Sequence, residues 1–210
     1  MEIERITPIY FSATGNTKEI VSSVTESLDI ENVRKFNLTI PEIREEFTDI
    51  HFEDKELLLI ATPVYTGEIP DFLVPVLEKL SGDGQPVILI SMDGGVGRGI
   101  ALEQLKYILE EEGFKTIGAA SFTGEHTYSK DGHEISPGRP KEKDLSEAKK
   151  FASEISDKLE DSKDLKDFKD IELDLKKGIY SQMRERIPTP QYGIKKLIHK
   201  PEVDKEKCIS

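Results

Sequence analysis

The segment YFSATGNTKEI, residues 10–20, joins two stretches whose hydrophobic residues repeat with different periods. The preceding run, residues 6–11, is mostly apolar and has the length of a strand, and it ends at a cluster of small hydroxyl and amide side chains. Beyond this cluster, apolar residues recur at helical spacing through residues 20–28. The pattern predicts a strand, a tight loop and a helix.

The predicted loop, residues 12–17 and named the first loop, has the chemistry of an anion site. It presents the hydroxyls of Ser12, Thr14 and Thr17, and Gly15 can adopt backbone angles closed to other residues. The start of the helix adds unpaired N–H groups, which favour a phosphate. Because the first loop contains no Lys or Arg, backbone dipoles and hydroxyls would hold the anion. The alternative is a helix cap formed by Thr14 or Asn16 without a ligand.

Two common nucleotide motifs do not fit the first loop. A nucleoside triphosphate loop ends in Gly-Lys-Ser/Thr, whereas this one has Gly15-Asn16-Thr17, and a dinucleotide loop needs three spaced glycines. The pattern Ser-x-Thr-Gly-Asn-Thr after a first strand resembles the phosphate loop of the flavodoxin family, which binds flavin mononucleotide (FMN). The resemblance implies these cofactor-binding residues: Ser12, Ala13, Thr14, Gly15, Asn16 and Thr17.

Composition limits the class of partner and the compartment. The 29 Lys and Arg residues against 41 Asp and Glu give a formal charge of -12, which argues against binding to nucleic acid or to an anionic membrane. The acidity serves solubility or steers the protein toward a basic redox partner. Cys208 is the single cysteine, so an internal disulfide is excluded. Without a long apolar run or a signal-peptide pattern, we expect a cytoplasmic protein.

Strand and helix patterns alternate along the first 160 residues. Because parallel strands need crossover connections, this alternation predicts a five-stranded parallel sheet with helices on both faces. The resemblance to flavodoxins implies that this is a flavodoxin-like α/β fold with a doubly wound sheet, followed by a C-terminal extension. Ligands in such folds lie beyond the carboxyl ends of the strands. The helix at 71–80 would begin with Asp71 as its N-cap, and Gly113 would end the helix at 100–112. The expected strands are 6–11, 32–38, 56–62, 86–91 and 116–122, and the further helices are 41–47 and 144–159.

The second loop, residues 62–70, follows the third predicted strand. Two prolines restrict its backbone, Gly67 permits a turn, and Tyr65 could lie against a flat heterocycle. The loop resembles the one that packs an aromatic side chain on the flavin ring in flavodoxins. The alternative is that Tyr65 only covers the end of the sheet. The binding residues implied here are Thr62, Pro63, Val64, Tyr65, Thr66 and Gly67.

The third loop, residues 91–99, contains four glycines within six residues. They would let the backbone approach a ligand closely, and free N–H groups could bond the polar rim of an isoalloxazine. Asp93 either tunes the flavin potential or caps the turn, and the cap is favoured. The binding residues expected here are Asp93, Gly94, Gly95, Val96 and Gly97.

The fourth loop, residues 124–140, is long and polar, as functional lids often are. His126 and Tyr128 could meet the substrate or the flavin edge, and Arg139 could hold an anion. The alternative for His126 is a loop histidine satisfied by its neighbours. Neither His126 nor His133 has metal-ligand spacing to another His or Cys, so no metal site is expected.

The chain changes character after residue 160. We expect a flavodoxin-like FMN-binding domain at 1–160 and a charged linker with a C-terminal extension at 161–210. The ending Val-Asp-x-x-x-Cys, residues 203–208, resembles the start of a bacterial ferredoxin segment, and the chain is similar to the flavodoxin part of EFR1-type flavodoxin–ferredoxin fusion proteins. One cysteine cannot hold a cluster, so the chain is expected either to be cut at the domain junction or to lack the ferredoxin half. A terminal cysteine without function is the alternative.

These patterns lead to one expected function and two alternatives. The first is an electron-transfer flavoprotein that binds FMN and exchanges electrons with a redox protein such as a ferredoxin or a reductase. The second is an FMN-dependent NAD(P)H oxidoreductase acting on quinones or other small acceptors. The third is a flavodoxin-like interaction module without cofactor. No catalytic residue and no oligomeric state is predicted.

Overall fold

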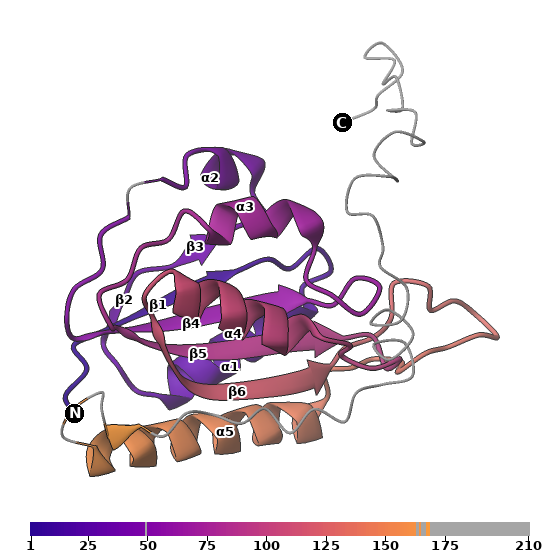
Figure 1. Ribbon diagram of the computed structural model, residues 1–210. Coiled ribbons are helices and arrows are strands. Elements are labelled where there is room, and N and C mark those ends of the chain that lie inside the picture. Colours follow the sequence, from indigo (N-terminus) through magenta and orange to yellow (C-terminus); the bar gives the residue numbers. More distant parts are fainter. Residues whose placement is uncertain (49, 163, 165–166, 169–210) are drawn as a thin grey trace.

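The computed structural model describes residues 1–48, 50–162, 164 and 167–168. Within this part, the strands form one parallel sheet in the order β2-β1-β4-β5-β6, and β3 also pairs with β1. The arrows for β4, β5 and β6 point to the same side of the molecule (Figure 1), so their carboxyl ends share one edge of the sheet. The strands are β1 (Arg5–Tyr10), β2 (Asn32–Val33), β3 (Phe36–Asn37), β4 (Glu56–Pro63), β5 (Pro86–Asp93) and β6 (Lys115–Thr123).

Helices cover both faces of the sheet and give three layers. The helices α1 and α5 lie together on one face, and α2, α3 and α4 lie on the other (Figure 1). The expected doubly wound parallel sheet is therefore confirmed. The helices are α1 (Asn16–Ser27), α2 (Pro41–Glu45), the 3-10 turn η1 (Asp71–Leu73), α3 (Val74–Leu77), α4 (Ala101–Glu111) and α5 (Glu142–Asp161).

The edge strand expected at 32–38 consists of two short pieces. Asn32 of β2 pairs with Arg5, and Phe36 of β3 pairs with Ile9 at the other end of β1. At the break, Arg34 directs its guanidinium to the buried carboxylate of Glu56, with Nη2 to Oε1 at 2.9 Å. An edge strand is bonded on one side only, so a side-chain interaction of this kind can interrupt it locally.

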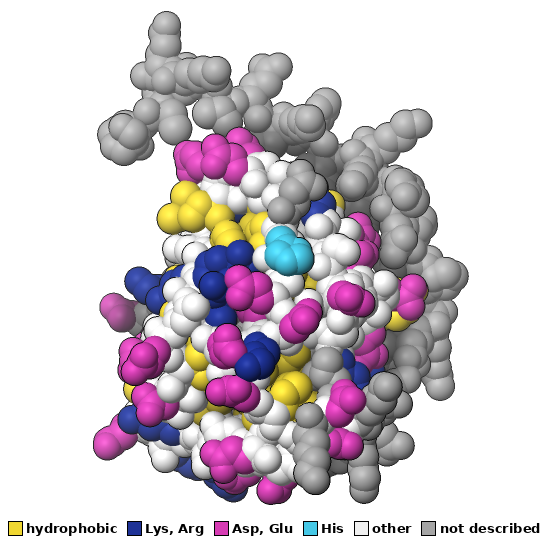
Figure 2. Space-filling model, turned by 90° about the vertical axis from the view of Figure 1, so that its left-hand side faces the viewer, with side chains coloured by type: hydrophobic (Ala, Val, Ile, Leu, Met, Phe, Trp, Pro, Cys, Tyr) yellow, Lys and Arg dark blue, Asp and Glu magenta, His cyan; other side chains and the backbone are white. Residues whose placement is uncertain are grey.

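The amino edge of the sheet carries mixed charges. Figure 2 views this end of the molecule and shows acidic and basic side chains interspersed rather than gathered by sign. Arg5 pairs with Glu53 at 2.7 Å, and Lys55 pairs with Glu2 and Glu4. Such an edge offers no single-sign surface for a charged ligand.

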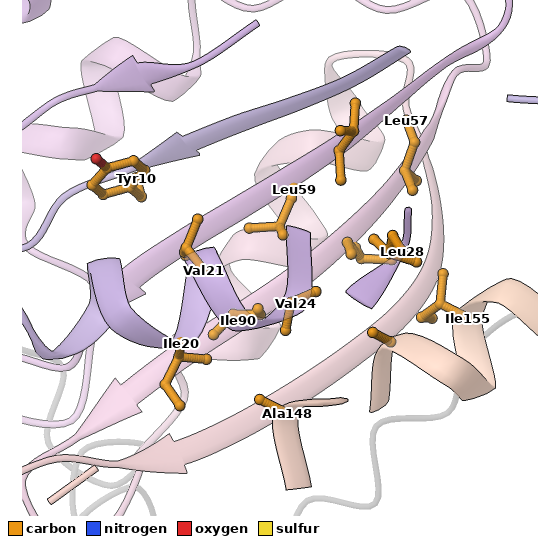
Figure 3. Close-up of a cluster of buried hydrophobic side chains, with 14 of the residues drawn as sticks. Tyr10, Ile20, Val21, Val24, Leu28, Leu57, Leu59, Ile90, Ala148 and Ile155 are labelled. Atoms are coloured by element: carbon orange, nitrogen blue, oxygen red, sulfur yellow. The ribbon is translucent and has the colours of Figure 1, made fainter. Parts of the chain in front are cut away.

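Two apolar clusters, one on each face of the sheet, form the core. In β4, Leu57 and Leu59 face α1 and α5, whereas Leu58 and Ile60 face the other helices, and all four are buried. Figure 3 shows the first cluster, in which Leu59 and Ile90 of the sheet lie near Val21 and Val24 of α1, and Ala148 and Ile155 come from α5. Burial on both faces explains why the sequence of β4 is a continuous apolar run.

The prediction of a helix at 71–80 with Asp71 as its N-cap is wrong in the bounds of the helix and in the N-cap residue. The segment begins as η1, and α3 ends at Leu77, with Pro70 rather than Asp71 preceding the first turn. Pro75 has no N–H to donate to the carbonyl of Asp71, so the α-helical ladder cannot begin there. In contrast, α4 ends as expected, with Gly113 at φ +88° just after the helix.

The other helices differ from expectation only in their ends. The short helix expected at 41–47 ends at Glu45. The last helix begins at Glu142 because Asp144 accepts the backbone N–H of Lys141 at 2.7 Å and closes a capping box. Among the described helices, none is long and apolar enough to cross a membrane.

Candidate functional site

The four loops leave the sheet at its carboxyl edge. From β1 the chain turns to β2 on one side, whereas β4, β5 and β6 follow one another on the other side. The strand order therefore reverses between β1 and β4, which is where ligands bind in open parallel sheets. The first loop follows β1, and the second loop follows β4, so both flank this point.

The first loop ends in an open helix N-terminus. Gly15 is the N-cap residue of α1 at φ +93°, and it provides no side-chain cap, so the cap by Thr14 or Asn16 considered from the sequence is not what the structure has. Ser12 accepts the backbone N–H of Lys18 on Oγ at 3.0 Å and donates its own backbone N–H to Thr39 Oγ1 at 2.9 Å. These bonds fix the loop against the first turn of α1.

Four backbone N–H groups remain available at this helix end. Among the described residues, none accepts a hydrogen bond from the N–H groups of residues 14–17. No atom lies within 4 Å of the position that a Cβ on Gly15 would take, and Ala13 and Thr14 are exposed. Thr17 is buried, and the amide of Asn16 turns away to donate to the carbonyl of Glu125 at 3.2 Å. The backbone and the hydroxyls of Ser12 and Thr14 thus offer the groups for an anion.

The second loop contains a tight turn that exposes Tyr65. Tyr65 and Glu68 exchange backbone hydrogen bonds of 2.7 and 3.1 Å, and the two residues between them, Thr66 and Gly67, have positive φ. This is the geometry of a type I′ turn. Tyr65 is 42% exposed, so its ring is accessible to a ligand. At the start of the loop, Thr62 is buried and its Oγ1 has no partner among the described residues.

The second and third loops are joined to each other. The carbonyl of Gly67 accepts the N–H of Ile100, and a Cβ on Gly99 would lie 1.9 Å from that carbonyl oxygen. Val64 donates its backbone N–H to the carbonyl of Met92 at 2.9 Å. The spacing between the two loops is therefore set by backbone contacts.

Asp93 caps the turn of the third loop. Its Oδ1 accepts the N–H of Gly95 at 2.6 Å, and its Oδ2 lies 3.4 Å from Thr123 Oγ1. The N–H of Gly95 is consequently not free, contrary to the expectation that it would bond a ligand. Val96 is 74% exposed, and a Cβ on Gly97 would meet no atom within 4 Å. The tip of the loop thus faces open space.

The fourth loop is anchored by an ion pair. Arg139 donates to both carboxylate oxygens of Asp144, with Nε to Oδ2 at 3.1 Å. This contact lowers the pKa of Asp144 and raises that of Arg139. Glu125 accepts the N–H of Gly138 at 2.7 Å, which lowers the pKa of its carboxyl. Arg139 is thus engaged by a carboxylate, and the expectation that it holds an external anion is not supported.

The fourth loop contacts both the first and the third loops. A Cβ on Gly124 would lie 2.6 Å from Asn16 Nδ2, one on Gly94 would lie 2.5 Å from His126 Cδ2, and one on Gly95 would lie 2.1 Å from Ser136 Oγ. At these three glycines, side chains of a neighbouring loop occupy the space that a Cβ would take, so the loops approach closely there. Sequence reasoning missed Thr39 and Ser136, because neither lies in a motif and each meets its partner only in the fold.

The chain has a flavodoxin-like fold. No family model matches the sequence, and no curated protein matches it. The flavodoxin 2 structure from Bacillus cereus is 16% identical, with 73% of this chain and 99% of that chain covered at a TM-score of 0.51. A Fusobacterium nucleatum flavodoxin bound to flavin mononucleotide is 18% identical (80% and 100% covered, TM-score 0.48), and an archaeal flavodoxin is 15% identical (74% and 99%, TM-score 0.47). At these identities the similarity concerns the fold alone.

Proposed function

We propose that this protein binds FMN non-covalently at the carboxyl edge of its sheet and acts as an electron-transfer flavoprotein of the flavodoxin type. The observation that carries the proposal is the first loop: the N–H groups of residues 14–17 have no partner among the described residues, and the Cβ position of Gly15 is open. The loop lies beside the point at which the strand order reverses. A phosphate suits this place because the helix dipole and the N–H groups both favour an anion.

The residues present fit the rest of the cofactor. The buried Oγ1 of Thr62 lacks a partner among the described residues, which a polar ligand group would supply. Tyr65 is exposed enough to stack on a ring, and the open tip at Val96 and Gly97 leaves room for its edge. The proposed lining thus comprises residues 12–17, 62–67 and 93–97.

The cofactor and the protein would have different roles. Bound FMN would supply the electron-accepting ring, and the protein would bind it, orient it and exclude water. The first loop would anchor the phosphate, the second loop would hold one face of the ring, and the third loop would border its edge. We assign no catalytic residue.

The domain organisation, the partner and the compartment are also proposals. We infer that residues 1–160 form the FMN-binding domain and that residues 161–210 form a charged linker and extension, as in EFR1-type flavodoxin–ferredoxin fusions. The partner would be a redox protein such as a ferredoxin or a reductase, and the compartment the cytoplasm. Cys208 and the rest of the ferredoxin-like ending lie outside the described residues.

The test is binding of FMN to the purified chain freed of any flavin. We expect the visible spectrum of FMN to shift and its fluorescence to be quenched on titration. Riboflavin, which lacks the phosphate, should bind much more weakly if the first loop holds the phosphate. Failure to bind saturating FMN would overturn the proposal and favour an interaction module, and rapid reduction by NADH or NADPH alone would favour the oxidoreductase.

A further inference from the structure

His126 of the fourth loop lies directly against the third loop. Its Cδ2 would be 2.5 Å from a Cβ on Gly94, so the imidazole occupies the space that any other residue at position 94 would need. The ring is partly buried, and its centroid is 5.0 Å from that of Tyr128 at 42°. His126 is thus the imidazole placed beside the proposed flavin edge.

The hydrogen bonds of His126 define its tautomer. Its Nδ1 accepts the backbone N–H of Tyr128 at 3.0 Å, so Nδ1 carries no proton and the proton of the neutral ring lies on Nε2. Nε2 is bonded to Cδ2, the atom that packs on Gly94. Among the described residues, none accepts a hydrogen bond from Nε2. The ring therefore presents a free donor next to the third loop.

The third loop is short of donors at this point. The N–H of Gly95 is bound to Asp93, whose carboxylate also adds negative charge there. A flavin that takes up two electrons and one proton gains one negative charge, and nearby donors stabilise that charge whereas carboxylates oppose it. A donor from outside the third loop would offset the effect of Asp93.

We propose that Nε2–H of His126 is a further cofactor-binding donor of this site, directed to the polar edge of the flavin beside Gly94, and that it favours the reduced flavin over the oxidised one. The inference rests on the proposed function. Arg139 cannot take this role because Asp144 engages its guanidinium, and Glu125 has the wrong charge.

The variant His126→Asn tests the donor role of Nε2 while keeping the hydrogen bond that holds the loop. An Asn side chain accepts the N–H of the residue two positions on, as in an Asx turn, so it replaces the Tyr128 bond but removes Nε2. His126→Gln places an amide donor near the former Nε2. His133→Asn is the matched control, since His133 is exposed at the far part of the same loop.

The experiment measures the affinity for oxidised FMN by fluorescence titration and the midpoint potential of bound FMN by dithionite titration. Together these give the affinity for the reduced form through a thermodynamic cycle. For His126→Asn we expect the preference for reduced over oxidised FMN to fall about tenfold, the value of one hydrogen bond to a charged group. His126→Gln should restore part of it, and His133→Asn should match the unchanged chain.

The outcomes separate the inference from the proposed function. Failure of the unchanged chain to bind FMN overturns the proposed function. Binding of FMN by all variants with the same midpoint potential overturns the role of His126. Thermal unfolding of the flavin-free variants provides the remaining check: a large loss of stability in His126→Asn together with equal loss of affinity for both redox forms would show a structural role only, and would also overturn the inference.

Discussion

The carbonyl oxygen of Gly67 accepts the backbone N–H of Ile100 at 2.7 Å, which ties the second loop to the start of α4. Ile69 adds a second tie by donating its N–H to Gln104 Oε1 at 2.9 Å. The second loop and the start of α4 are thus held in a fixed relative position before any ligand binds. A ligand that contacts the second and third loops would therefore pay little for ordering them.

Gly99→Ala should disturb this contact between the second and third loops. Its Cβ would lie 1.9 Å from the Gly67 carbonyl oxygen, and φ is +55° at this position. Because both a clash and backbone strain follow, we expect a loss of about 2–4 kcal/mol in the free energy of unfolding, with weaker FMN binding. Urea denaturation and FMN titration measure the two effects.

Gly132→Ala is the control for Gly99→Ala. Gly132 also has a positive φ, +81°, but a Cβ there meets no atom within 4 Å. It should cost only the conformational strain of about 1–2 kcal/mol and leave FMN affinity unchanged. Equal behaviour of the two variants would contradict the assigned contact.

Removal of the hydroxyls of the first loop should weaken FMN binding. Thr14 is exposed beside the free N–H groups, and Thr17 lies in the first turn of α1. The double variant Thr14→Ala, Thr17→Ala should lower FMN affinity about tenfold, chiefly through the exposed Thr14 hydroxyl, because a hydrogen bond to a charged group contributes over 1 kcal/mol. Thr25→Ala, in the same helix but away from the loop, is the control. Unchanged FMN affinity in the double variant would contradict the phosphate assignment.

The sequence predicts the fold well because its signals are local. Each signal is contained in a short stretch of sequence: the apolar run of β4, the apolar run of β5, and the change from strand to helix period across the first loop. The contacts between loops leave no such signal. Asn16 and Glu125, which join the first and fourth loops, are separated by 109 positions. The positions of the loops and the favoured Asp93 cap were therefore predictable, whereas the engagement of Arg139 by Asp144 was not.

Tyr65→Ala should alter the bound flavin. The ring of Tyr65 is half exposed at the second loop, and stacking of aromatic rings contributes about 0.5–1.5 kcal/mol beyond burial. We expect FMN affinity to fall several-fold and the midpoint potential to shift, since stacking affects the two redox states differently. Tyr107→Ala, on the exposed face of α4, should change neither quantity. A midpoint potential unaffected by Tyr65→Ala would mean that the ring does not stack there.

Asp144 should give the stability a specific acid dependence. Its pKa is lowered in the folded state, chiefly by Arg139, so its contribution is fully present above the unfolded value of about 3.9 and is lost as the pH falls toward the folded value. At neutral pH, Asp144→Asn should cost about 1–2 kcal/mol, given that Arg139 is partly exposed. The difference from the unchanged chain should shrink below pH 4. Urea denaturation across this range measures it, with exposed Asp157→Asn as the control, and a difference independent of pH would contradict the ion pair.

Glu56→Gln should be strongly destabilising although it lies far from the proposed site. The carboxylate is fully buried, its Oε1 accepts from Arg34 and from the Thr7 hydroxyl, and its Oε2 accepts the N–H of Glu53 at 2.9 Å. An amide keeps the shape but leaves Arg34 without its anion and turns a donor toward other donors. We expect a loss of about 2–4 kcal/mol in urea denaturation. Glu53→Gln removes only the exposed pair with Arg5 and should cost under about 1 kcal/mol.

Because Glu56 lies at the amino end of β4, opposite the loops, the folded Glu56→Gln protein should bind FMN as tightly as the unchanged chain. A selective loss of FMN affinity would mean that the two edges of the sheet are coupled.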